Sequence, residues 1–321
     1  MTSGAPICTV VIGATRQGSL PAAIRSVQRQ TFDRWELLLI GQGEDAGIRE
    51  VASRWQLEEP RIRYLHLAHR GLSRARNAGL EVSRGAWVAM MDDDCEASPD
   101  WLAVLAARFQ ADPELGLIGG SMLAPPKPAG HGFGRCPHWE PAEASFDSAR
   151  ESRPPEGFGI VGGNFALRRE VAMRIGRFDE SFGVGAEFPA AEEMDYLFRA
   201  FAHGVKVVAT PSAVVHHSDG WRFGYRTVLR HQRQRGLGNG ALAAKRMMRG
   251  DAGGREELDA LLGKIAKDLI HLRRPEGAWY TPHFWLGYRR CVRGYVLGTD
   301  GTLRPRQAQS HGIPASGDAV A

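Results

Sequence analysis

The chain has 321 residues with a formal net charge of +5, and 43% of its residues are hydrophobic and 24% are charged. This composition is typical of a globular protein and leaves room for one large domain with an appendage. No run of about 18 or more apolar residues occurs, which excludes a predicted transmembrane helix, and the first residues lack the pattern of a signal peptide, so we expect a cytoplasmic protein.

Strands and helices alternate along the first part of the chain. The expected strands span 7–12, 35–40, 62–67, 87–91 and 116–122, and the expected helices span 20–30, 47–55, 73–82 and 99–110. This alternation predicts an α/β fold with a doubly wound, parallel sheet. We expect a catalytic, nucleotide-binding domain over 1–221.

The strand expected at 87–91 ends in three carboxylates, Asp92, Asp93 and Asp94. Ligands of open α/β sheets bind at the carboxyl ends of the strands, and clustered carboxylates need a positive partner. Hard oxygen ligands suit Mg²⁺ or Mn²⁺, so the cluster predicts a divalent cation site. A solvated acidic loop ahead of the next helix is the alternative.

Four cysteines occur in the chain, at Cys8, Cys95, Cys136 and Cys291. They are far apart and have no metal-binding spacing. We interpret them as reduced, structural thiols, Cys95 included, although it follows the acidic cluster.

Residues 124–159 interrupt the regular pattern with seven prolines among glycines and serines. A loop of this length inside a compact domain is usually functional or mobile. We interpret it as an active-site lid or acceptor loop, with a disordered insertion as the alternative.

A second acidic cluster, Glu192, Glu193 and Asp195, begins a helix expected at 192–203. The dipole at a helix N-terminus explains one or two of these acids structurally. Three within four residues indicate that at least one faces a cleft, where it could act as a general base. His216 and His217 end a strand that starts near 205, and alternation turns one of them toward a metal or phosphate.

The C-terminal part is basic. Residues 220–250 contain eight Arg or Lys residues and no Asp or Glu, which predicts contact with phosphates, a nucleotide or an anionic membrane, with a solvated helix face as the alternative. We expect a mainly helical extension over 222–300 and a disordered tail over 301–321. The stretch 279–297 suits membrane contact, dimer packing or core packing.

Five motifs in this order resemble the family 2 glycosyltransferases of the GT-A fold. They are Ser73-Arg74-Ala75-Arg76-Asn77-Ala78-Gly79, Trp87 to Asp94, Gly162-Gly163-Asn164 through Glu180, Glu192 to Arg199, and Pro211 to His217. Each motif alone is weak, but their order and spacing over residues 6–235 are specific. The resemblance implies a Rossmann-like, mostly parallel central sheet with flanking helices, and transfer of a sugar with inversion.

The resemblance also implies a role for each matching residue. Asp94 would bind the metal together with His217, for which His216 is the second choice. Glu193 would be the base, with Glu192 and Asp195 as the other candidates. The residues implied to contact the donor or acceptor are Asp92, Asp93, Arg76 and Asn164.

Two segments depart from the family pattern. Gly41-Gln42-Gly43-Glu44 replaces the usual "DDGS", and Gly13-Ala14-Thr15-Arg16-Gln17 replaces "PTYNR". We therefore expect the nucleotide base to be recognised by backbone groups near Ala14, by Gln42 or by Asp45.

These observations together predict a metal-dependent glycosyltransferase that uses Mn²⁺ or Mg²⁺. The expected donor is a nucleoside-diphosphate sugar, and the expected acceptor is a glycan, a lipid-linked molecule or a small molecule. We also expect the protein to make peripheral contact with the inner face of a membrane and to bind no nucleic acid. One alternative is a sugar-phosphate nucleotidyltransferase, which would need a Gly-rich, Arg-containing loop after the first strand; residues 13–18 match such a loop poorly. The other alternative is a degenerate nucleotide-sugar or polyanion-binding module.

Overall fold

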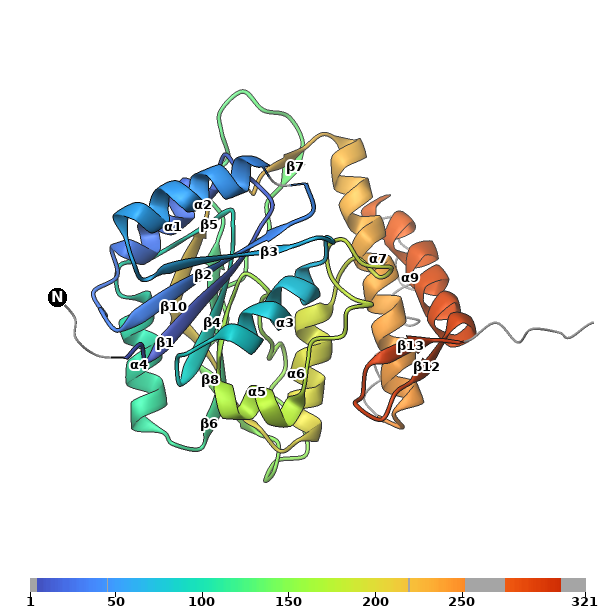
Figure 1. Cartoon of the computed structure of the whole chain (residues 1–321). Coiled ribbons are helices and arrows are strands. Elements are labelled where there is room, and N and C mark those ends of the chain that lie inside the picture. Colours follow the sequence, from blue (N-terminus) through green and yellow to red (C-terminus); the bar gives the residue numbers. More distant parts are fainter. Residues whose placement is uncertain (1–4, 45, 219, 252–274, 307–321) are drawn as a thin grey trace, which may run out of the picture.

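A computed structural model describes residues 5–44, 46–218, 220–251 and 275–306. In these residues a mixed central sheet of nine strands has helices on both faces, and two long helices stand beside it (Figure 1). The α/β fold class expected from the sequence is confirmed.

The central sheet has the order β3-β2-β1-β4-β9-β6-β10-β5, and β8 also pairs with β10. Its strands are β1 (Cys8–Ala14), β2 (Trp35–Gln42), β3 (Ile62–Leu67), β4 (Trp87–Asp92), β5 (Cys95–Ala97), β6 (Leu115–Leu123), β8 (Ala144–Asp147), β9 (Asn164–Arg168) and β10 (Lys206–His217). Strands β3, β2, β1 and β4 are parallel neighbours, and so are β6 and β10. The carboxyl ends of β1, β2 and β4 therefore meet at one edge.

Two layers of helices cover the sheet (Figure 1). The helices are α1 (Leu20–Gln28), α2 (Ala46–Glu58), α3 (Leu72–Val82), α4 (Trp101–Ala111), α5 (Arg169–Ile175) and α6 (Glu192–Ala202). Side chains alternate along β1, so Val10 and Ile12 pack with α1, α2 and α4, whereas Val11 packs with α3, α5 and α6. This alternation produces one apolar cluster on each face of the sheet.

The C-terminal extension consists mainly of α7 (Tyr225–Met248) and α9 (Pro275–Gly294), followed by the strands β12 (Tyr295–Leu297) and β13 (Leu303–Pro305). The two helices pack closely because α7 is rich in small residues. A Cβ at Gly240 would collide with the carbonyl of Phe284, so only glycine fits there. A third apolar cluster, which includes Phe182, Phe188, Ala241 and Leu242, joins the extension to the part of the chain that contains the central sheet.

Several expectations from the sequence need correction. The segment after Gly163 forms β9, which runs antiparallel to β4 and β6 and so interrupts the expected parallel order. The Pro-rich segment is not a disordered insertion, because it contains β8 and also β7 (Gly134–Arg135), which pairs with β11 (Arg222–Phe223).

The C-terminal boundaries also differ from those expected. The helix within 279–297 ends at Gly294, and the last three residues of this stretch, Tyr295–Leu297, form β12. Within 301–321, which we expected to be disordered, Leu303–Pro305 form β13, because this strand closes a hairpin with β12. Residues 307–321 lie outside the described residues.

Candidate active site

The carboxyl end of β4 and the end of β10 lie side by side. Strand β5 follows the three aspartates and pairs antiparallel with β10, with His217 directly opposite Cys95. This register places the imidazole Nε2 of His217 3.1 Å from Oδ2 of Asp94, and both side chains are buried. His216 points the other way, with its Nε2 3.3 Å from Oγ of the partly exposed Ser98. Strand alternation therefore turns His217, and not His216, toward Asp94.

Asp93 is occupied by backbone groups. Its carboxylate accepts hydrogen bonds from the backbone N–H groups of Thr15 (2.6 Å) and Arg16 (2.8 Å), and it pairs with the Arg16 guanidinium at 2.5 Å. These contacts fix the loop between β1 and α1. In this structure Asp93 therefore serves the loop, and its expected contact with the donor stays a prediction.

Asp94 lies between two positive or hydrogen-bonding groups. Arg16 Nη1 is 3.1 Å from its Oδ2, and His217 Nε2 is equally close. Burial by itself raises the pKa of Asp94, but the hydrogen bond from His217 and the charge of Arg16 outweigh burial, so its pKa is lowered. Asp94 is therefore a carboxylate at neutral pH, as a metal ligand must be.

Asp92 ends β4 in a different environment. Its nearest positive group is Arg76, at 3.7 Å, which is longer than a hydrogen bond. Burial raises the pKa of Asp92 to about 6; the charge of Arg76 lowers it, and those of Asp94 and Asp93 raise it. A Cβ at Gly163 would lie 3.0 Å from Asp92 Oδ2 and 2.9 Å from Met122 Sδ, so the Gly162-Gly163 turn can approach this carboxylate only without a side chain.

Arg76 joins this cluster to the second acidic motif. Its guanidinium is buried and donates to Oε1 of Glu192 at 3.0 Å and to the carbonyl of Gly162 at 2.7 Å. The neighbouring Glu193 has no ion pair with another described residue. Burial and the charge of Glu192 raise the pKa of Glu193 to about 8, although Arg76 acts in the opposite direction. Glu192 is thus committed to Arg76, whereas Glu193 keeps its carboxyl group available.

Asp195 is engaged in ion pairs away from Asp92 and Asp94. It is buried, with Lys245 Nζ 2.6 Å from Oδ1 and Arg199 Nε 3.0 Å from Oδ2. Burial raises the pKa of Asp195, but these two cations outweigh burial and lower it. Both oxygens are held in a buried ion-pair network, so Asp195, one of the other candidates for the base, is less available than Glu193.

Asn164 and Gln42 also serve the fold. The amide of Asn164 donates to the carbonyls of Ser121 and Ala213, both at 2.7 Å, and accepts from the Trp101 indole at 2.9 Å. The side-chain oxygen of Gln42 accepts from the backbone N–H of Gly71 at 2.8 Å. Asn164 is fully buried with both amide hydrogens engaged, and Gln42 is buried with its oxygen engaged, so the expected contacts of these two side chains with the donor or acceptor stay predictions.

Two residues that the sequence did not single out complete the site. Arg16 contacts Asp93 and Asp94, and its position after the first strand, in the segment that departs from the family pattern, is the signal that could have found it. Cys136, from the Pro-rich segment, places Sγ 3.7 Å from Nδ1 of His217. Arg222, part of the basic stretch, is also close: burial and Arg16 lower its pKa while Asp94 raises it. The Pro-rich segment and β11 therefore border the Asp94–His217 pair.

Some residues of the basic stretch are buried and serve the fold. Lys245 and Arg246 are buried, and Arg246 pairs with Asp251 at 2.7 Å, so neither is available to an anionic ligand. Ala14 is buried at the end of β1, beside Gly41 of β2. Asp45 lies outside the described residues.

The oxygen, nitrogen and sulfur atoms of Asp94, His217 and Cys95 lie within 4.8 Å of one another. Burial raises the pKa of Cys95 well above its ordinary value, so its thiol stays protonated. The carboxylate and imidazole, with Asp92 nearby, are the donor atoms suited to a divalent cation.

Comparison with known proteins gives a consistent result. The sequence model of the family "Glycosyl transferase family 2" matches residues 9–176. The chain is 26% identical over 231 residues to a glucosyl-dolichyl phosphate glucuronosyltransferase of Haloferax volcanii, a match that covers 69% of each chain. It is 37% identical over 89 residues to YibD, an uncharacterized glycosyltransferase of Escherichia coli, but this match covers 28% of the chain and 26% of YibD.

A solved structure shares the fold. The mannosyltransferase PcManGT from Pyrobaculum calidifontis, in complex with GDP-Man and Mn²⁺, superposes with a TM-score of 0.59 over 90% of this chain and 88% of that one. At 14% sequence identity, this likeness establishes the arrangement of strands and helices and nothing finer.

Proposed function

This chain belongs to glycosyl transferase family 2, and we propose that it transfers a sugar, with inversion, from a nucleoside-diphosphate donor to an acceptor hydroxyl. The observation that carries the proposal is one juxtaposition. The Asp94–His217 pair, suited to a cation, and the available carboxyl group of Glu193 are linked through Asp92, Arg76 and Glu192.

The cation site fits these residues. Asp92 lacks a close positive partner and has a raised pKa, as expected of a carboxylate beside like charges. Asp94 and His217 would hold Mn²⁺ or Mg²⁺, with Asp92 beside them. A bound cation would stabilise the negative charge that develops on the departing nucleoside diphosphate. The choice between the two metals is part of the proposal.

Glu193 is the proposed base. In an inverting transfer, the base removes the proton of the acceptor hydroxyl while that oxygen attacks the anomeric carbon and the bond to the diphosphate breaks. Glu192 cannot take this role without losing Arg76, and Asp195 is held by Lys245 and Arg199. Only Glu193 in this motif combines an uncommitted carboxyl group with a pKa near the physiological range.

Positive side chains surround the position proposed for the diphosphate. Arg16 and Arg222 lie on the Asp94 side, and Arg76 lies on the Glu192 side. We propose that backbone groups at the ends of β1 and β2, near Ala14 and Gly41, recognise the base, because Gln42 is engaged with Gly71.

The proposed acceptor is the hydroxyl of a glycan, a lipid-linked molecule or a small molecule. A relative whose name includes dolichyl phosphate supports the lipid-linked class. We propose that the enzyme works in the cytoplasm, at the inner face of a membrane.

The test is release of nucleoside diphosphate from a panel of nucleotide sugars, with Mn²⁺, Mg²⁺ or EDTA, comparing wild type with Glu193→Gln, Glu192→Gln and Asp94→Ala. We expect one donor to be hydrolysed or transferred with metal, and turnover to fall about 10²–10⁴-fold in Glu193→Gln, the range for loss of a general base. Asp94→Ala should lose the response to metal. Glu192→Gln is the matched control, and its loss of turnover should be smaller because Arg76 can still donate a hydrogen bond to the amide oxygen of the glutamine.

Each alternative would give its own result. A nucleotidyltransferase would release pyrophosphate when given a sugar phosphate and a nucleoside triphosphate. A degenerate binding module would bind nucleotide sugars without turnover, and Glu193→Gln would change nothing. Full activity in Glu193→Gln with normal metal dependence would reject Glu193 as the base while leaving the transferase in place.

A further inference from the structure

The exposed face of α9 takes no part in the proposed reaction. Residues three or four positions apart lie on one side of a helix, and here that side carries Pro282, Leu286, Arg289, Arg290 and Arg293, all exposed. On the opposite side, Phe284, Gly287 and Cys291 are buried, and a Cβ at Gly287 would collide with the carbonyl of Leu237 in α7. The helix therefore presents a basic face outward while its apolar side holds it to the protein.

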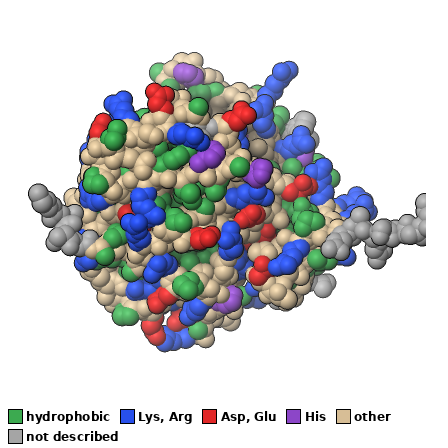
Figure 2. All heavy atoms as spheres, viewed as in Figure 1, with side chains coloured by type: hydrophobic (Ala, Val, Ile, Leu, Met, Phe, Trp, Pro, Cys, Tyr) green, Lys and Arg blue, Asp and Glu red, His purple; other side chains and the backbone are tan. Residues whose placement is uncertain are grey.

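The charge of this face is poorly compensated. The closest acid is Glu187, whose Oε1 lies 3.9 Å from Nη1 of Arg290, and no ion pair holds Arg289 or Arg293 among the described residues. These side chains line an open groove of about 710 Å³ together with Trp285 and Leu286. Figure 2 shows Lys and Arg side chains gathered along the edge of the molecule that α7 and α9 form, with hydrophobic side chains between them.

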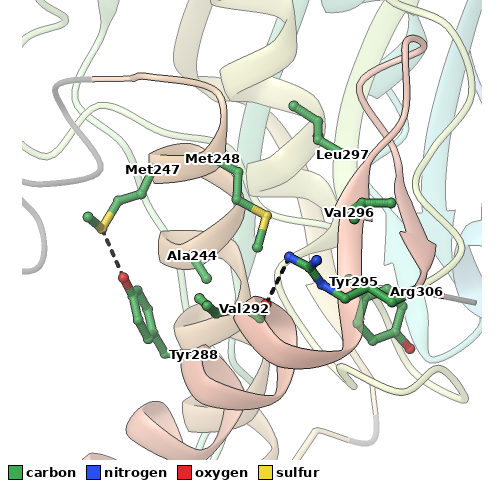
Figure 3. A pocket seen from close by; sticks show the side chains of 9 residues that line it. All are labelled: Ala244, Met247, Met248, Tyr288, Val292, Tyr295, Val296, Leu297 and Arg306. Atoms are coloured by element: carbon green, nitrogen blue, oxygen red, sulfur yellow. Dashed lines mark hydrogen bonds between the residues drawn. The ribbon is translucent and has the colours of Figure 1, made fainter. Parts of the chain in front are cut away.

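An apolar groove adjoins the basic one. It has a volume of about 430 Å³ and lies between the ends of α7 and α9 and strand β12, where Met248, Val292 and Val296 line a common space (Figure 3). Val292 is 39% exposed and Val296 is 40% exposed, so the groove presents adjacent apolar side chains to solvent. Arg306 donates to the carbonyl of Val292 at 3.4 Å, so its positive charge borders this groove. Tyr295 lines both grooves and makes them one continuous surface.

We propose that this surface, consisting of the exposed side of α9 and the adjoining apolar groove, docks onto a membrane that contains anionic phospholipids. The arginines would meet lipid phosphates, and Leu286, Val292 and Val296 would reach the boundary of the acyl chains. This is how an amphipathic helix lies in the plane of a membrane. None of the helices in the described ranges is both long and apolar enough to span a bilayer. The docking goes beyond the proposed reaction, because it needs neither donor nor cation.

The test is flotation of the full chain with vesicles of phosphatidylcholine alone or mixed with phosphatidylglycerol, without nucleotide or metal. We expect binding to the mixed vesicles only. The variant R289E/R290E/R293E should bind about 100-fold more weakly, since each basic residue near an anionic surface contributes about fivefold, or ~1 kcal/mol. The matched control R226E/R230E/R233E makes the same change in charge on the exposed side of α7 and should stay within about fivefold of wild type.

A second measurement guards against misfolded variants. Trp285 lines the basic groove, so phospholipids with brominated acyl chains should quench part of the tryptophan fluorescence in wild type, and this part should be missing in Trp285→Phe. Equal loss of binding in both triple variants, binding to vesicles without anionic lipid, or quenching that is unchanged in Trp285→Phe would overturn the proposal. A dimer that R289E/R290E/R293E converts to a monomer, without lipid binding by wild type, would assign the surface to a second copy instead. Because these readouts use no substrate, they are independent of whether the proposed transfer reaction is correct.

Discussion

Glu193 has a carboxyl group whose protonation should control turnover near neutral pH. Burial and the charge of Glu192 raise its pKa to about 8, and a base must be deprotonated to accept a proton. We therefore expect kcat/KM to rise with pH through about 8 and to fall about tenfold for each unit below it, as measured in a profile of initial rates. A flat profile between pH 6 and 9 would contradict the assignment.

The same shift affects stability with a defined sign. The folded state holds the Glu193 proton more tightly than the unfolded state, whose ordinary pKa is 4.5. The contribution of Glu193 to the free energy of unfolding is therefore fully present below about 4.5 and is lost as the pH rises through about 8. Glu193→Gln, which cannot ionise, should remove this slope from unfolding curves measured across that range.

Single residues also show how far the site could be predicted from the sequence. The resemblance to family 2 implied a common site for Asp92, Asp94, Arg76 and Glu192, and in the structure Arg76 lies between Asp92 and Glu192. The sequence alone could not show which polar side chains form hydrogen bonds or ion pairs within the fold itself. Asn164 and Asp195 are engaged by groups far away in the sequence, namely the carbonyl of Ala213 and the ammonium of Lys245, and no local pattern records these partners.

At the scale of elements, one buried lysine joins α7 to the segment that carries the candidate base. Lys245 Nζ lies 2.7 Å from Asp179 Oδ2 and 2.6 Å from Asp195 Oδ1, and Asp179 also accepts from the backbone N–H of Leu303. Removing one partner of a buried ion pair typically costs 3–5 kcal/mol, because the remaining charges are left without compensation. We expect Lys245→Met to lower the free energy of unfolding by about 3 kcal/mol in chemical denaturation.

Lys206→Met provides the control for this joint. Lys206 pairs with Asp112 at the same 2.7 Å distance, but both side chains are partly exposed, so its loss should cost less than about 1 kcal/mol. If the two variants proved equally stable, the buried network would not contribute to the attachment of the extension.

The elements themselves were predicted unevenly. Apolar periodicity and turn residues marked β1–β4, β6, α1–α4 and α6 to within a few residues, because these segments have their own local signals. Strand β9 was missed, and so was the three-residue β5, which sets the register of His217 against Cys95. Such short strands are defined by the partners they pair with, and a single sequence does not show those partners.

The whole molecule determines how the segments outside the regular core are used. We interpreted the Pro-rich segment as an active-site lid or acceptor loop, with a disordered insertion as the alternative, and in the structure β7 pairs with β11 and Cys136 reaches His217. We expected the basic stretch to contact an anionic partner or to form a solvated helix face, but the fold buries Lys245 and Arg246, leaves Arg226, Arg230 and Arg233 exposed and brings Arg222 near Asp94. The positions of Cys136 and Arg222 depend on contacts across more than eighty residues, so composition could indicate a charged surface but not where it would lie.

The proposed donor site draws on the same long-range arrangement, which leads to a prediction for the stability of the whole protein. Arg16 follows β1, Asp94 follows β4, His217 ends β10 and Arg222 belongs to β11, so a bound donor and cation would connect elements across the sheet. A ligand that binds only the folded state adds about 2.7 kcal/mol to the free energy of unfolding when its concentration is 100 times its Kd. This corresponds to a rise in Tm of about 5 °C for a protein of this size. We expect this rise with Mn²⁺ and the correct nucleotide sugar, and its loss with EDTA or in Asp94→Ala. Asp112→Ala, an equivalent change at the Lys206 pair, should keep it, and an equal rise in Asp94→Ala would place the cation elsewhere.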